Sequence, residues 1–352
     1  MTMKLRIGLL TTVCLLLLGE RSVYGHVKWF VEHDVSKPPL PIGEVLDGTF
    51  VKMFLVSVAG IYLFFLADRY IFKRGILAEF DKRLKRFDDL ASLIMRVSAG
   101  IFFFSLFVWY TVYGSTFYLT PELTTQAKWV AWLHLAMAVS LVFRQGAVFA
   151  GVGIFILFAA ALGDFGLFHM LDYLIFPGIG VFLVTSSIRN GEWLRAGFIT
   201  LFACAGLTLI WASVEKFGYA AWTYPLLEQT PSLTMGLDPR TFMKLSGFIE
   251  FNVTFILLGA VSVIGRLISL GMMSIFVLAV FEFGMVDAIG HLMIVAILFV
   301  LIVRGPTDAR YMLVLPEKSI FTEAYFMTGL YFLAFGMIFI LYYGLHHVLY
   351  GT

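Results

Sequence analysis

The sequence predicts an all-α polytopic membrane protein with about ten transmembrane helices. Of its 352 residues, 60% are hydrophobic and 14% are charged, whereas soluble domains are about 45–50% apolar and about 25% charged. Apolar stretches long enough to cross a bilayer as helices recur along the whole chain. They lack the alternation of polar and apolar residues that is typical of a lipid-facing β-barrel. The lipid bilayer is therefore the predicted partner of most of the chain.

Residues 1–25 are predicted to form a signal peptide. They begin with Lys4 and Arg6, and an apolar core too short to span a membrane follows. Cleavage after Gly25 would leave His26 as the mature N-terminus of an exported segment, residues 26–48. An uncleaved anchor is the alternative, and it gives the same topology with one more helix.

The first span and a basic loop, residues 49–89, orient the protein. Between residues 68 and 89 lie seven Lys or Arg, and short loops rich in these residues stay in the cytoplasm. We therefore expect a bacterial inner-membrane protein with both mature termini outside. The predicted spans are 49–67, 90–113, 129–143, 146–162, 171–188, 194–214, 241–260, 263–281, 286–303 and 324–345.

The chain contains an internal repeat of four spans, residues 90–188 and 194–303. The sequence Gly163-Asp-Phe-Gly166 in the first half matches Phe281-Glu-Phe-Gly284 in the second. A further polar residue follows each acid, five positions on. Four spans is an even number, so the halves are expected to have parallel orientation. The alternative is a chance likeness between apolar segments. Residues 304–352 add a last span and an exported tail.

The second half resembles the DoxX/DoxD family of four-helix membrane proteins. The resemblance is carried by Trp193-Leu-Arg195-Ala-Gly197, Trp211-Ala-Ser-Val-Glu-Lys-Phe217, Phe248-Ile-Glu-Phe251 and Leu257-Leu-Gly259. It is best over 194–303 and weaker over 92–188. It implies a four-helix DoxX-like unit in each half. It also implies a quinone-linked redox system, such as a thiosulfate:quinone oxidoreductase, that includes a partner subunit with a redox centre.

Glu250 and His134 are the candidate catalytic residues. Each lies within a predicted span, where an ionisable side chain is costly and usually faces a cavity or a partner. Glu250 could accept protons from a quinol, or it could be a structural partner of Lys244 or Asn252. His134 could bind a quinone carbonyl, ligate haem together with His291, or be hydrogen-bonded within the core.

Four further residues are candidates for cofactor binding at the outer ends of spans: Trp211, Glu215, Lys216 and His291. For Glu215 and Lys216 the alternative is an interfacial ion pair. Quinone is the expected cofactor, with haem or a metal ion as alternatives.

The predicted outer face also gathers residues that could ligate a metal ion. Histidine with carboxylate is a ligand set for zinc, iron or manganese, and helix capping is the alternative role for the acids. A mature N-terminal histidine followed by a second histidine suggests copper. The candidate ligands are His26, His33, His169, Asp172, Asp164, Glu282 and Asp287.

Composition argues against dithiol chemistry and against nucleic-acid binding, and three function classes remain under consideration. Of the two cysteines, Cys14 lies in the leader, so the mature chain has no thiol pair for dithiol chemistry. The basic residues lie in inner loops, which argues against nucleic-acid binding. A quinone-linked redox protein is the leading hypothesis. A transporter for a small solute or metal ion is the second, and a non-catalytic scaffold or assembly factor is the third.

Overall fold

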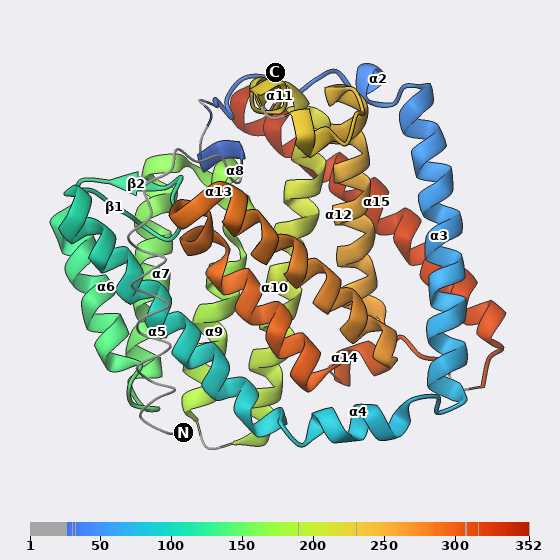
Figure 1. Ribbon diagram of the computed structural model, residues 1–352, viewed down its shortest axis with the longest axis horizontal. Coiled ribbons are helices and arrows are strands. Elements are labelled where there is room, and N and C mark those ends of the chain that lie inside the picture. The colour runs from blue at the N-terminus through green and yellow to red at the C-terminus, as the bar shows by residue number, and fades with distance from the viewer. Residues whose placement is uncertain are drawn as a thin grey trace.

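The computed structural model describes residues 27–29, 31, 33–188, 190–229, 231–306, 308–315 and 317–351. These residues are almost entirely helical and include one short two-stranded hairpin (Figure 1). The predicted all-α fold is therefore confirmed. The predicted signal peptide and His26 lie outside the described residues.

The helices run between two ends of the bundle, which we name the α4 end and the α11 end (Figure 1). The α4 end carries α4 (Ala78–Lys85) and α14 (Asp308–Tyr311). The α11 end carries α2 (Ile42–Val45), α11 (Tyr224–Gln229) and the C-terminus. The long helix α3 (Gly48–Lys73) connects the two ends.

The first half of the bundle begins where α4 turns back into the apolar region. Its elements are α5 (Asp88–Tyr113), β1 (Thr116–Phe117), β2 (Thr124–Thr125), α6 (Lys128–Ser140), α7 (Ala147–Phe165), α8 (Leu167–Met170), η2 (Leu171–Tyr173) and α9 (Ile175–Ser187). The two strands pair antiparallel, with Thr116 opposite Thr125. This pairing closes the loop between them into a tight hairpin at the α11 end.

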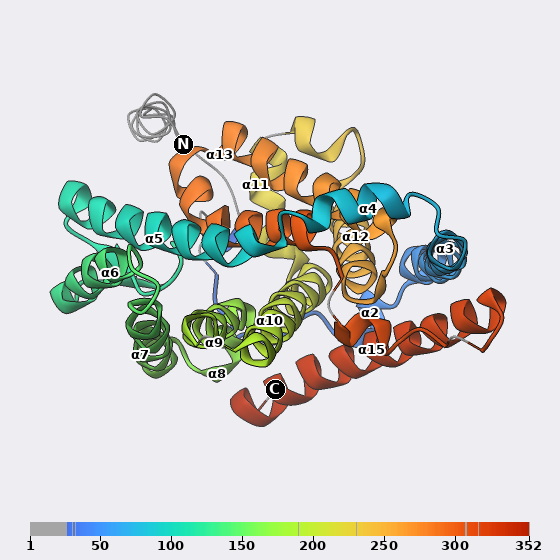
Figure 2. The ribbon, with the colours of Figure 1, turned by 90° about the horizontal axis from the view of Figure 1, so that it is seen from below.

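The second half contains longer helices. Its elements are α10 (Gly191–Gly218), η3 (Ala220–Trp222), η4 (Pro231–Thr234), α12 (Pro239–Gly259), α13 (Val263–Arg304) and α15 (Ile320–Tyr350), with α11 and α14 between them. Viewed from below, α15 lies along one side of the bundle, and α5 and α6 lie at its far edge (Figure 2).

Each of the ten predicted spans falls on a helix. Eight described helices, counting the two parts of α13 separately, are long and apolar enough to cross a membrane. Leu167–Tyr173 and Ile175–Ser187, which are bent by 56° at the break between them, make a ninth span only if the pair crosses the membrane as one. The range 129–143 corresponds to α6, whose 13 residues fall short of the about 20 that a full crossing needs. The multi-pass helical architecture is confirmed, and the count of about ten depends on this bent pair and on α6.

Two glycines end or bend helices at matching places in the chain. Gly166 follows α7 with φ 80° and ψ 163°, and Gly284 interrupts α13 with φ 74° and ψ −153°. Both conformations have a positive φ that glycine adopts without a steric penalty. Each glycine therefore sets a break within a hairpin of two spans.

Close backbone approach also depends on glycine where α7, α9 and α10 pack side by side. A Cβ on Gly178 would lie 2.5 Å from Cys204 Cβ, and one on Gly151 would lie 2.7 Å from the Gly180 carbonyl oxygen. Small residues at such contacts let membrane helices pack through van der Waals contact. A second, aromatic core joins α3, α10, α12 and α15 through Phe50, Phe217, Phe248, Phe335 and Phe339.

The N-terminal segment, which we define as the described residues between 27 and 47, lies across the α11 end. It begins with η1 (Val27–Trp29). The Leu40 amide donates to the Gly218 carbonyl oxygen at 2.8 Å, and the Tyr219 hydroxyl donates to the Lys37 carbonyl oxygen at 2.7 Å. The ring of Trp29 lies directly over Gly290, where a Cβ would be 2.0 Å from the ring.

Replacing Gly290 with alanine should weaken the docking of η1. The added methyl group overlaps the Trp29 ring, and overpacking of this kind costs about 1–3 kcal/mol. Gly271→Ala is the matched control, because Gly271 lies in the same helix α13 with nothing within 4 Å of its Cβ position. We expect a lower melting temperature for Gly290→Ala than for Gly271→Ala in detergent. Equal melting temperatures would contradict the observed contact of Trp29 with α13.

Candidate functional site

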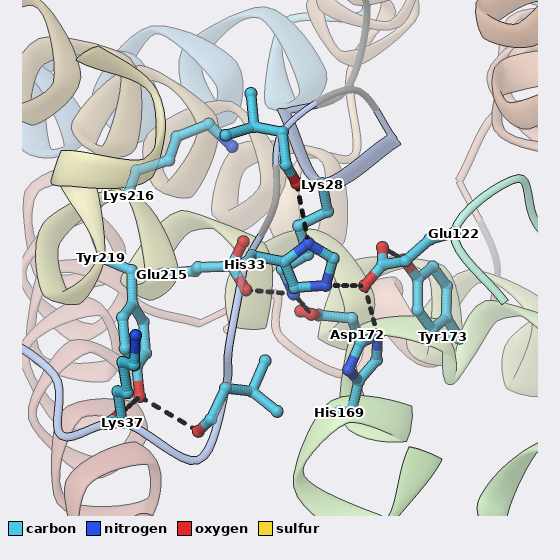
Figure 3. Close-up of polar contacts among 12 residues, drawn as sticks. Lys28, His33, Lys37, Glu122, His169, Asp172, Tyr173, Glu215, Lys216 and Tyr219 are labelled. Atoms are coloured by element: carbon cyan, nitrogen blue, oxygen red, sulfur yellow. Dashed lines mark hydrogen bonds and ion pairs between the residues drawn. The ribbon is translucent and has the colours of Figure 1, made fainter. Parts of the chain in front are cut away.

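Charged and aromatic side chains meet under the N-terminal segment at the α11 end (Figure 3). They come from η1, the β1–β2 loop, α8, η2 and the end of α10, and most are buried. Buried ionisable groups in a membrane protein usually mark a functional region. We name this set the polar cluster; it consists of Lys28, His33, Glu122, His169, Asp172, Tyr173 and Glu215.

Lys28 lies at the centre of one half of the polar cluster. Its ammonium group forms ion pairs with the carboxylates of Asp172 and Glu215, and its side chain is fully buried. Burial opposes the charged form, but the two carboxylates outweigh this effect and raise the pKa of Lys28. Lys28 therefore stays charged and ties η1 to the ends of both η2 and α10.

Glu122 lies at the centre of the other half. Its Oε1 is 3.2 Å from His33 Nε2 and in contact with His169 Nε2, while its Oε2 accepts a hydrogen bond from the Tyr173 hydroxyl. Burial favours the neutral carboxyl, yet Lys28 and the two histidines hold the pKa of Glu122 well below its usual range. The carboxylate is therefore ionised and fixed in orientation by groups on both of its oxygens.

His33 is oriented by its second ring nitrogen. Its Nδ1 lies 3.1 Å from the Val31 carbonyl oxygen, which fits an Nδ1–H donor and leaves Nε2 facing Glu122. Burial lowers the pKa of His33, and the neighbouring Glu122 carboxylate more than offsets this, so the net shift is upward. Trp222 lies beside the imidazole, with ring centroids 5.6 Å apart, and stacks on Tyr219 at 4.1 Å.

His291 and Asp287 form a second, smaller polar contact below η1. Their Nδ1 and Oδ2 atoms are 2.9 Å apart, and Asp287 is fully buried. The Trp29 ring lies 4.9 Å from the His291 ring. The N-terminal segment thus contacts polar residues of both hairpins, Asp172 and His169 in one half and His291 in the other.

Glu250 and His134, the candidate catalytic residues, contact residues of other elements rather than residues close to them in the sequence. Glu250 pairs with Lys216 of α10. Lys244 pairs instead with Asp47, and Asn252 accepts a hydrogen bond from the Tyr331 hydroxyl. His134 is fully buried, and its Nε2 lies 3.1 Å from the carbonyl oxygen of Tyr118.

The remaining candidates divide between the polar cluster and separate contacts. Trp211 packs in the aromatic core, 4.7 Å from the Tyr342 ring. Asp164 accepts a hydrogen bond from the Tyr118 hydroxyl at 2.7 Å. His26 and the side chain of Glu282 lie outside the described part of the structure. Within that part, one group of three has ligand atoms all within 4.8 Å of one another: His33, Glu122 and His169.

Sequence reasoning missed three members of the polar cluster: Lys28, Glu122 and Tyr173. Glu122 lies in the loop between two spans, where exposure is the ordinary expectation. The weak signal was its setting, Tyr118-Leu-Thr-Pro-Glu122-Leu, in which the acid stands among apolar and turn residues. Lys28 carried a comparable signal, as a cation between the apolar residues Val27 and Trp29.

Comparison of the chain with protein-family models, curated proteins and solved structures finds no match. The function must therefore be argued from the residues themselves.

Proposed function

We propose that this chain is a quinone-linked redox protein of a bacterial inner membrane, working with a partner subunit that carries a redox centre. The observation that carries the proposal is the Lys216–Glu250 ion pair on α10 and α12. Its side chains are 30% and 14% exposed, so the pair is reachable from the surface of the bundle. Lys216 directly follows Glu215, a member of the polar cluster.

The chemistry of this pair suits a quinone head group. Reduction of a quinone to a quinol takes two electrons and two protons, and oxidation returns them. The Lys216 ammonium group can donate a hydrogen bond to a quinone carbonyl oxygen, and the Glu250 carboxylate can accept a proton from a quinol hydroxyl. The electrons pass to or from the redox centre of the partner subunit.

The proposed orientation places the α4 end in the cytoplasm and the α11 end outside. It is supported by the basic residues of α4 and its flanks and by the rule that such segments stay inside. Both mature termini and the polar cluster are then on the outer side.

The tandem repeat and the DoxX/DoxD resemblance belong to the same proposal. The matched sequences place Gly166 opposite Gly284, and both have a positive φ and an extended ψ. This agreement supports two related four-helix units, residues 90–188 and 194–303. The resemblance rests on sparse positions that include Trp211, Glu215 and Glu250.

The test is binding of ubiquinol-1, the form whose hydroxyl groups can donate to Glu250, to the purified protein under anaerobic conditions, followed by quenching of tryptophan fluorescence. We expect saturable quenching and a dissociation constant about tenfold higher for Glu250→Gln, because a hydrogen bond to a charged group contributes about 1.5–3 kcal/mol. Glu228→Gln, an exposed acid on α11, is the matched control and should bind like the wild type.

Two outcomes would contradict the assignment of a quinone site to Glu250. One is quenching that does not saturate. The other is equal affinity in the Glu250→Gln and Glu228→Gln variants. Unchanged affinity for the same probe in a Glu250→Ala, His134→Ala double variant would show that neither residue belongs to the quinone site. Solute uptake by sealed vesicles without an electron donor would favour a transporter, and neither activity would favour a scaffold.

A further inference from the structure

We infer that His33, Glu122 and His169 form a binding site for one divalent transition-metal ion at the α11 end. His33 Nε2 and Glu122 Oε1 are 3.2 Å apart. Two ligands of one ion with bonds of about 2.1 Å are about 3.0–3.4 Å apart. The ligand atoms of the three residues all lie within 4.8 Å of one another.

Glu122 Oε1 and His169 Nε2 face each other, and they are better explained as two ligands of a metal ion than as the two partners of a hydrogen bond. Glu122 Oε1 and His169 Nε2 are buried and in contact, yet neither has a hydrogen-bond partner. An oxygen lone pair and a nitrogen lone pair that face each other repel unless a proton or a metal ion lies between them. A shared metal ion removes this conflict.

Groups around the ligands hold them in the form that binds metal. The Val31 carbonyl oxygen takes the Nδ1–H of His33, which leaves the Nε2 lone pair free. The Tyr173 hydroxyl donates to Glu122 Oε2, which leaves Oε1 free. Ligating histidines and carboxylates are commonly oriented by such second contacts. Loss of one such contact typically weakens metal affinity by about 10–100-fold.

The net charge of the polar cluster favours the binding of a divalent cation. The described cluster contains three carboxylates, Glu122, Asp172 and Glu215, against a single ammonium group, Lys28. With neutral histidines and all three carboxylates ionised, the cluster would carry two negative charges in a buried setting, where uncompensated charge is costly. A divalent ion bound by Glu122 brings the total to zero.

Two histidines and one carboxylate favour a first-row transition metal, and this set with open positions suits non-haem iron(II). Iron or manganese could serve as a redox centre close to Glu215 and the Lys216–Glu250 pair. That role rests on the proposed quinone function, whereas the metal site itself does not.

The experiment measures the metal content of the full-length protein purified without chelator, followed by Co²⁺ titration of the stripped protein by visible absorption. We expect about one equivalent of transition metal and a saturable cobalt spectrum. Glu122→Gln and His169→Ala should lose both, and Tyr173→Phe should bind Co²⁺ about 10–100-fold more weakly. The control Glu228→Gln changes an exposed carboxylate on α11 at the same end of the bundle, and it should bind normally.

The outcomes separate the two proposals. A wild-type protein that contains no metal and gives no cobalt spectrum would overturn the site and point to protonated histidines as the balancing charge. Unchanged Co²⁺ affinity in Glu122→Gln would overturn it as well. Because Glu122→Gln keeps the side-chain shape, its melting temperature reports whether a loss of binding merely follows unfolding. Cobalt binding without ubiquinol-1 binding would leave the metal site standing and contradict the quinone function.

Discussion

Lys28→Met should lower the free energy of unfolding by about 3–5 kcal/mol, which is the usual cost of removing one partner of a buried ion pair. Lys28 is fully buried, and it is the described cation that contacts both Asp172 and Glu215. These two carboxylates are only 6% and 13% exposed, so water cannot replace the lost ammonium group. The methionine side chain fills a similar volume, so the loss reports charge rather than packing.

The measurement is thermal melting of the purified protein in a mild detergent. Lys37→Met is the matched control, because Lys37 belongs to the same N-terminal segment and is exposed. A triple variant, Lys28→Met with Asp172→Asn and Glu215→Gln, should recover most of the loss, since neutral partners need no counter-charge. If Lys28→Met and Lys37→Met had the same melting temperature, the N-terminal segment would not be bound to the bundle in solution. The polar cluster would then not be covered by this segment.

The helices could be predicted from the sequence because their signal is local. A span is defined by length and apolarity within about 20 residues, and each predicted range falls on a helix of the structure. The short helix α6 was harder to predict. Its predicted range, 129–143, is already shorter than a full span, and the helix ends at Ser140, before the turn that leads to α7.

Side-chain partners could not be predicted in the same way, because they depend on how helices are rotated against one another. The structural alternative for Glu250 gave it Lys244 or Asn252 of its own helix as a partner. Its partner is Lys216, 34 residues away on α10. The pairing of Lys28 with Asp172 joins positions 144 residues apart. Apolar sequence gives little information about such contacts.

The candidate metal ligands also divide into residues that could be predicted from the sequence and one that could not. His33 and His169 could be chosen from residue type and from their predicted outer position. Glu122 could not, because a loop residue is expected to be exposed until the fold of the loop is known. The short pairing of β1 with β2 closes the loop that carries Glu122, and the hydrogen bond from Tyr173 fixes the carboxylate. The third ligand is thus a product of tertiary structure.

Arg69→Met should be as damaging as Lys28→Met, but at the opposite end of the bundle. Near the α4 end, Arg69 of α3 pairs with the neighbouring Asp68 and with Glu323 of α15, where Nε and Oε2 are 3.1 Å apart. All three side chains are fully buried. Asp68 also accepts a hydrogen bond from the Ser262 amide at 2.9 Å, which ties in the turn between α12 and α13.

The substitution removes a guanidinium group that compensates two buried carboxylates. We therefore expect a loss of about 3–5 kcal/mol in unfolding free energy, part of which is offset by Lys73, because it also pairs with Glu323. Arg74→Met is the matched control, since Arg74 follows at the exposed end of the same helix. Both variants are compared by thermal melting in the same detergent.

Co²⁺ affinity gives this prediction a second readout. Arg69 lies at the α4 end and the proposed metal ligands lie at the α11 end, so Arg69→Met protein that is still folded at low temperature should bind Co²⁺ like the wild type. Lys28→Met should weaken Co²⁺ binding as well as stability, because Lys28 holds η1 and thereby His33 in place. Equal losses of Co²⁺ affinity in both variants would mean that metal binding reports only general folding. Loss in Lys28→Met alone would assign the site to the polar cluster.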